Sequence, residues 1–119
     1  MTDAMTGAEL KVQLTGLGLT PGWLADQLSI TSRTVLRWLD QDVIPTKAVA
    51  VIEMVTEFTD REIEKITQTA RITGAVYTRR TDEGVAERNT LSATWHRHAA
   101  FRALNNLRAS GTHVTVEYA

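Results

Sequence analysis

Leucines recur at three- and four-residue spacing near the start of the chain, which is the period of a helix with one buried face. They are Leu10, Leu14 and Leu17. Thr6 followed by Glu9 has the spacing of a capping box, in which two side chains satisfy amides at a helix start. Gly18 is a suitable helix terminator. The pattern predicts a first helix that ends near Leu17 and buries these leucines.

Two short helices separated by a tight turn are predicted next. A proline at the first helical position loses no hydrogen bond, so the Thr-Pro pair at the start of the segment predicts a helix over 21–28. A turn over 29–31 follows. A third helix is predicted over 32–39, capped by the hydroxyl of Thr31 or Ser32.

After a polar connection over 40–46, the pattern predicts two further helices, over 47–58 and 60–73. Thr59 and Glu62 repeat the capping-box spacing and separate the two helices, and a glycine at position 74 ends the second. The residues expected to face the core are Val51, Met54, Val55, Phe58, Ile63, Ile66, Ala70 and Ile72. Five helices therefore fill the first 74 residues.

The pattern of the remaining residues indicates short strands around one long helix. Strands are predicted over 75–78 and 85–88, with a turn between them, and a helix over 91–110 follows. Apolar residues then alternate with polar ones in a terminal strand. The alternating apolar residues are Val114, Val116 and Tyr118.

The predicted fold class is mainly α, with a five-helix domain over 1–74 and a small α+β region over 75–119. A chain of 119 residues excludes a large multidomain enzyme. It has no cysteine, which excludes disulfides and thiolate sites and makes a reducing cytoplasm the simplest location. The sequence shows neither a signal peptide nor an apolar run of about 18 residues, so we expect a soluble protein without membrane contact.

Charge is distributed unevenly along a chain whose net charge is −1. Through residue 60 there are four Lys or Arg against eight Asp or Glu, whereas the rest has nine against six. An acidic balance disfavours nucleic-acid binding, because phosphate neutralisation supplies much of the affinity. However, Arg33 and Arg37 are the only basic residues between Lys11 and Lys47, and they lie one helical turn apart. Positive charge in the acidic half is therefore focused.

Six apolar residues between positions 21 and 38 suit two helices that cross steeply over a short turn. They are Leu24, Ala25, Leu28, Ile30, Val35 and Trp38. With these residues, the segment LADQLSITSRTVLRW resembles helices two and three of the Xre-type, lambda-repressor-like helix-turn-helix family. The resemblance implies a five-helix domain over about 6–73 that binds double-stranded DNA as a transcriptional regulator.

The sequence departs from that family at two positions. Pro21 stands where the family often has a glutamine that contacts the DNA backbone, so this phosphate contact must come from elsewhere. Ser29 stands where the turn often has glycine. Serine can still adopt the turn, at some strain or with a local hydrogen bond.

The resemblance implies that the helix over 32–39 enters the major groove. The DNA-binding candidates are the residues that point away from the buried stripe: Thr31, Ser32, Arg33, Thr34, Leu36 and Arg37. Arg33 and Arg37 are expected to bind guanine, because guanidinium offers a planar pair of donors to O6 and N7. Ser32 and Thr34 suit phosphate or mixed contacts. Leu36 suits a thymine methyl group, or else packs on the edge of the core.

No set of residues in the sequence supports catalysis or metal binding. His96 and His98 lie two apart on a predicted helix and so face different directions, and His113 is isolated. No Ser/His/Asp set, paired carboxylates or glycine-rich phosphate loop stands out. We therefore expect no enzyme, no metal and no cofactor.

The last predicted helix carries large apolar residues on more than one side. Its main stripe is Ala99, Ala100, Ala103, Leu104 and Leu107. Trp95 and Phe101 fall outside this stripe. The helix therefore packs either entirely within its own chain or also against a second subunit. A terminal strand can also pair across a two-fold axis. The dimerisation candidates are Trp95, Phe101, Leu104, Val114, Val116 and Tyr118. The segment WHRHAAFRA followed by VTVEY is similar to the C-terminal dimerisation region of anti-CRISPR-associated regulators.

Six arginines follow residue 75, and three roles are open for them. They can contact phosphate, bind RNA or form a solvated face. They are Arg79, Arg80, Arg88, Arg97, Arg102 and Arg108. Two functions therefore stand side by side. One is a homodimeric repressor that reads DNA, with a possible RNA or protein co-regulator. The other is a protein-interaction module, antitoxin-like or anti-repressor, that uses the same fold to bind another regulator.

Overall fold

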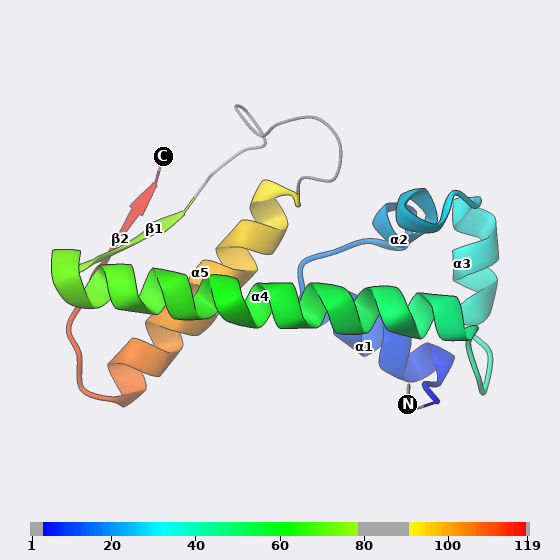
Figure 1. The fold of residues 1–119 in the computed structure, drawn as a ribbon, viewed down its shortest axis with the longest axis horizontal. Coiled ribbons are helices and arrows are strands. Elements are labelled where there is room, and N and C mark those ends of the chain that lie inside the picture. The colour runs from blue at the N-terminus through cyan, green and yellow to red at the C-terminus, as the bar shows by residue number, and fades with distance from the viewer. Residues whose placement is uncertain (1–3, 79–90, 119) are drawn as a thin grey trace. The chain divides into compact units, whose positions relative to one another are not determined.

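The computed structural model describes residues 4–78 and 91–118, which form five helices and two strands (Figure 1). The elements in chain order are α1 (Gly7–Gly16), α2 (Pro21–Leu28), α3 (Ser32–Trp38), α4 (Thr46–Thr73), β1 (Ala75–Thr78), α5 (Ala93–Ala109) and β2 (Thr115–Tyr118). The protein is therefore mainly helical with a small parallel sheet, in line with the predicted class. The strand expected over 85–88 lies outside the described residues.

The first three helices begin as expected, each at a threonine. The hydroxyls of Thr6, Thr20 and Thr31 accept hydrogen bonds from backbone amides three residues later, at 3.0, 3.1 and 3.3 Å. Each bond satisfies one amide that has no partner within the helix. The predicted leucines of α1 are buried, together with the apolar residues of the next helices. The buried apolar residues of this part include Leu10, Leu14, Leu17, Leu24, Val35, Trp38, Ile44 and Ile52.

The two helices predicted over 47–58 and 60–73 are a single helix, α4. No glycine or proline interrupts it, and buried residues continue through the predicted break at helical spacing. Thr59 does not cap a helix. It is buried, and its Oγ1 accepts a hydrogen bond of 2.9 Å from Nε1 of Trp95. The capping-box spacing was misleading here because a threonine can also serve as a buried acceptor inside a helix.

Three residues of α4 that were expected to face the core are exposed: Met54, Phe58 and Ile72, the last 87% exposed. The continuous helix explains the error. Its buried stripe follows Ile52, Val55, Thr59, Ile63, Ile66 and Ala70. Met54 and Phe58 each lie one position before a member of that stripe, so about 100° separates them from it around the helix axis.

The chain divides into two compact units, Met1–Glu57 and Phe58–Ala119. This boundary differs from the expected one at residue 74, because the second half of α4 packs into the second unit. Ile63, Ile66 and Ala70 share one core with α5 and with Val76 and Val114. A fragment that ends at residue 74 would expose this apolar stripe of α4.

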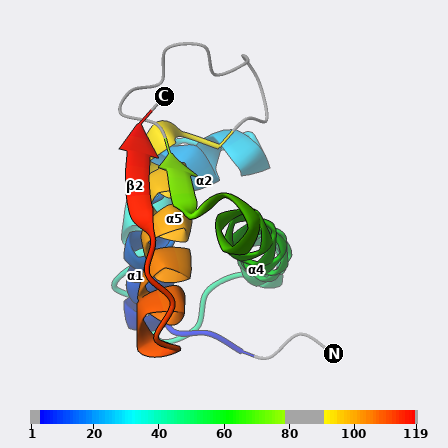
Figure 2. The ribbon, with the colours of Figure 1, turned by 90° about the vertical axis from the view of Figure 1, so that its left-hand side faces the viewer.

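The sheet of the second unit consists of β1 and β2, which run parallel in the described residues. Val76 lies opposite Val116, and Thr78 opposite Tyr118. Figure 2 shows β1 between α4 and β2, with α5 behind the sheet. The hydroxyl of Ser92 caps α5 by accepting from the amide of Trp95 at 3.2 Å.

We predict that Gly7→Ala strongly destabilises the first unit. The amide of Gly7 donates to the carbonyl oxygen of Gln41 at 2.8 Å, so the start of α1 lies directly on the backbone after α3. A Cβ at this position would collide with the carbonyl oxygens of Trp38 and Leu39. Overpacking of this kind costs about 1–3 kcal/mol or more. Denaturant unfolding measures the loss.

The matched control is Gly16→Ala, at the other end of α1, where an added Cβ has no neighbour within 4 Å. This change is expected to leave stability unchanged or to raise it by up to about 1 kcal/mol, because alanine favours helix. Equal unfolding midpoints for the two variants would contradict the close approach at Gly7.

We also predict that Thr59→Val destabilises the second unit by about 1–3 kcal/mol, because it leaves the indole N–H of Trp95 buried without this acceptor. Thr59→Ser keeps the hydroxyl and is expected to lose less. The free energies of unfolding of the two variants, measured by denaturant unfolding, test the contact. A valine variant as stable as the serine variant would show that the bond contributes nothing.

Candidate nucleic-acid interface

A three-residue turn connects α2 to α3 and sets the direction of the second helix. Ser29 adopts the left-handed conformation, with φ 56° and ψ 43°, and the amide of Ile30 donates to Ala25 O at 3.0 Å. The expected strained serine is therefore present. For a residue with a Cβ this conformation costs roughly 1–2 kcal/mol, which the packing of the two helices must offset.

The apolar residues that the sequence places between α2 and α3 are mostly buried. Leu24, Ala25, Val35 and Trp38 are fully buried, whereas Leu28 and Ile30 are half-buried. The face of α3 that carries Val35 and Trp38 therefore belongs to the core. The opposite face of α3 is left to solvent.

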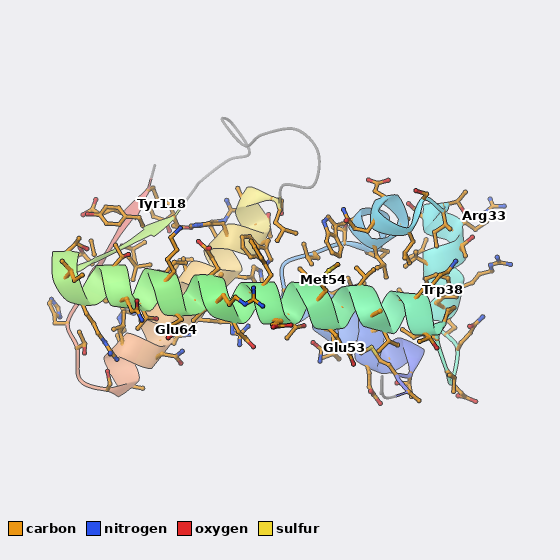
Figure 3. The ribbon with its side chains drawn as sticks, viewed as in Figure 1. Arg33, Trp38, Glu53, Met54, Glu64 and Tyr118 are labelled. Atoms are coloured by element: carbon orange, nitrogen blue, oxygen red, sulfur yellow. The ribbon has the colours of Figure 1, made fainter. Side chains whose placement is uncertain are left out.

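The structure places all six predicted DNA-binding residues on or beside this exposed face. Arg33, Leu36 and Arg37 are exposed, Leu36 at 52%, and Figure 3 shows Arg33 projecting outward from α3. Thr31 and Ser32 are exposed at the start of the helix. Thr34 is half-buried, and its hydroxyl lies 3.0 Å from that of Thr31, so it belongs partly to the cap.

Lys47 is a third cation near α3 that the sequence reasoning did not single out. Its Nζ lies 5.9 Å from the ring centroid of Trp38, a cation–π distance. Lys47 is exposed in the first turn of α4. In the sequence, the signal that could have identified Lys47 was its position as the first basic residue after Arg37. The contact to Trp38, however, depends on a fold of the 40–46 connection that no local pattern specified.

The N-terminal ends of α2 and α3 lie side by side. An ideal Cβ on Gly22 would be 3.7 Å from both Ser32 Oγ and Thr20 Oγ1. Two hydroxyl groups therefore lie near the N-terminal amides of two helices. This combination suits an anionic group. Gly22 keeps this corner open, since it adds no side chain between them.

The predicted dimerisation residues differ in how deeply they are buried. Trp95, Leu104 and Val114 are buried within the second unit, so they are core residues and provide no surface for a partner. Trp95 also packs its ring against Phe58, with centroids 5.7 Å apart. By contrast, Phe101 and Tyr118 are 39% and 42% exposed. Val116 is half-buried against the core.

His96 is packed between two polar partners. Its Nδ1 lies 3.1 Å from Thr78 Oγ1 and its Nε2 lies 3.8 Å from Glu62 Oε1. The order hydroxyl, imidazole, carboxylate is also that of a nucleophilic triad. Thr78 is only 2% exposed, however, so a substrate cannot reach its hydroxyl in this conformation. The described residues contain no group of three potential metal ligands.

Two of the C-terminal arginines have polar partners within the second unit. Arg97 Nη2 donates to Thr94 Oγ1 at 3.2 Å, and Arg102 Nη2 lies 3.8 Å from Asp60 Oδ1. The arginines at positions 79, 80 and 88 lie outside the described residues. No helix in the described parts of the chain has the length and apolar character needed to cross a bilayer.

No protein-family model and no curated protein sequence matches this chain. The geometry of α2 and α3 and the charges around them are therefore the features that bear on what this chain binds.

We predict that substitution of Trp38 lowers the stability of the fold, whereas substitution of either arginine of α3 does not. Trp38→Ala is expected to lower the free energy of unfolding by about 3–5 kcal/mol, because it removes a buried aromatic side chain. Arg33→Ala and Arg37→Ala are expected to stay within about 0.5 kcal/mol of wild type, because both side chains are exposed. Thermal or denaturant unfolding measures all three. A stable Trp38 variant would mean that α3 is held by other contacts.

Proposed function

We propose that this protein is a sequence-specific double-stranded DNA-binding regulator that reads the major groove with α3. One observation carries the proposal: α3 buries Val35 and Trp38 and exposes Arg33 and Arg37 on its other face. These two arginines concentrate positive charge in a unit that is otherwise acidic. The resemblance of α2 and α3 to the Xre-type helix-turn-helix supports the same assignment.

The exposed side chains of α3 provide complementary ways to recognise base pairs. Each guanidinium offers two parallel donors, which match the O6 and N7 acceptors of guanine in the major groove. Leu36 lies between the arginines in sequence and is half exposed, which suits contact with the methyl group of thymine. Such a site would favour guanines separated by a position where thymine is preferred.

Phosphate contacts are assigned to residues around α3. Lys47 carries the third positive charge near this helix, and the hydroxyls of Thr20 and Ser32 lie at adjoining helix N-termini. Helix N-termini favour anions through their amides and their dipole. These groups replace the backbone contact that Pro21 cannot make. They position the protein on the duplex and carry no sequence information.

The expected activity is transcriptional repression in the cytoplasm, because a protein of this size that occupies a promoter acts most simply by excluding polymerase. The acidic balance through residue 60 favours one alternative, a protein-interaction module of the antitoxin-like or anti-repressor kind. In that case Leu36 and the arginines would contact an acidic or apolar protein surface. A measurement of DNA binding distinguishes the DNA-binding regulator from the protein-interaction module directly.

Selection of binding sites from a random duplex library tests the proposal. Wild-type protein is expected to enrich one motif. Arg33→Ala and Arg37→Ala are each expected to weaken binding to that motif by roughly 5- to 150-fold, equivalent to about 1–3 kcal/mol, and to relax the preference at one base pair. Arg71→Ala removes the same charge from an exposed position of α4 in the second unit and is expected to bind as wild type.

Lys47→Ala distinguishes phosphate contacts from base contacts. It is expected to weaken binding to all sequences about equally and to reduce the salt dependence by about one counterion. Fluorescence anisotropy at several salt concentrations measures both effects. If no motif is enriched, or if both α3 arginine variants keep wild-type affinity and preference, α3 does not read DNA and the interaction module becomes the better account.

A further inference from the structure

The second unit contains a cavity of about 180 Å³ between α4, β1 and α5. Its lining residues on α4 run from Glu62 to Thr69, at the spacing of a single helix face. On β1 they are Ala75 and Tyr77, which share one face of the strand because side chains alternate. His96 is the lining residue on α5. Figure 2 shows α4 beside β1, with α5 behind the sheet. All of these residues belong to one compact unit.

The wall of the cavity is apolar and its rim is polar. Ile66 and Ala75 are buried, at 8% and 7% exposure. Lys65, Thr69 and Tyr77 are exposed. Sites for small molecules commonly combine apolar walls with a few polar groups that fix the orientation of the ligand. The cavity has both components.

The carboxylate of Glu62 is held at this cavity by a contact to another element. Lys65 lies three residues later on the same face of α4, within reach of Glu62. Among the described side chains, however, Glu62 Oε1 is directed to Nε2 of His96 on α5, at 3.8 Å. The ring of His96 is positioned in turn by its Nδ1, which lies 3.1 Å from Thr78 Oγ1. A carboxylate offers about four acceptor sites, so Glu62 keeps acceptor capacity for a ligand.

The ammonium group of Lys65 lies at the same rim. Within residues 4–78 and 91–118, its Nζ makes no hydrogen bond or ion pair. An ammonium group offers three donors. The cavity therefore presents a fixed negative charge and an unpaired positive charge about one helical turn apart, beside an apolar wall.

We propose that this cavity binds a free α-amino acid with a small apolar side chain. The ammonium group of the ligand contacts Glu62, its carboxylate contacts Lys65, and its side chain packs against Ile66 and Ala75. The size agrees with this ligand class. A water molecule occupies about 30 Å³ in the liquid, and drug-sized ligands need roughly 300–1,000 Å³. The cavity therefore has room for a small amino acid and is too small for a nucleotide.

The two charges select against other small metabolites. A dicarboxylate or a phosphate would place a second negative charge beside Glu62. A diamine would place a second positive charge beside Lys65. Discrimination of this kind, in which the wrong ligand meets a like charge, is a general source of specificity. Only a ligand that carries both charges close together satisfies both side chains.

Isothermal titration calorimetry of the full-length chain tests the site, with L-alanine, L-valine and L-leucine as probes. No DNA is present, so the outcome is independent of the proposed function. At least one of the three is expected to bind saturably. Its N-acetyl derivative lacks the ammonium group and its carboxamide lacks the carboxylate. Each derivative is expected to bind at least about tenfold more weakly, because it loses a hydrogen bond between charged groups.

Two variants assign each charge of the ligand to one side chain. Glu62→Gln is expected to lose the preference for the amino acid over its N-acetyl derivative. Lys65→Met is expected to lose the preference over the carboxamide. A variant that merely disturbed the fold would not remove one preference and keep the other. The matched control is Glu64→Gln, an exposed position of α4 outside the cavity lining, which is expected to bind as wild type.

Three results would overturn the proposal. The first is that none of the three amino acids binds saturably to wild type. The second is that both derivatives bind as tightly as the amino acid itself. The third is that Glu62→Gln and Lys65→Met, shown by circular dichroism to be folded, keep both preferences of the wild type.

Discussion

The burial of Val35 and Trp38 is the interaction on which the orientation of α3, and therefore its exposed face, depends. The helix that carries them, α3, has only seven residues, and a helix of that length is not stable alone in water. Its position is therefore set by its contacts. With two side chains fixed in the core, the helical period leaves Arg33 and Arg37 on the opposite face. The exposed face is thus a direct consequence of the buried one.

The contacts around Trp38 also join segments that are distant in sequence. The amide of Gly7 bonds to the backbone just after α3, and the amide of Ile44 bonds to Met5 O at 3.0 Å. These bonds hold the 38–44 segment against the start of α1. Lys47, in the first turn of α4, then places its Nζ 5.9 Å from the ring centroid of Trp38. Trp38 therefore lies beside the exposed face of α3, the close approach at Gly7 and the ammonium group of Lys47.

The sequence predicted this half of the molecule well because its signals are local. Three threonine caps and a proline set the helix starts, and apolar spacing identified the buried face of each short helix. The prediction was wrong where a local signal had a second meaning. Thr59 has the spacing of a cap, yet its hydroxyl is the buried acceptor for Trp95, which is 36 residues later. Only a long-range contact distinguishes the two roles.

The small number of cations around α3 has a consequence for affinity. Under the proposed function, three charged contacts release few counterions, so a single α3 surface on this acidic unit would gain little from electrostatics and would obtain its specificity from base contacts. Such a surface would distinguish one DNA sequence from another more effectively than it would bind any of them tightly. Two such surfaces on one particle raise the affinity through effective concentration, without adding any contact to either surface. Under the proposed function, an acidic unit of this kind therefore gains more from the pairing of two α3 surfaces than a basic unit would.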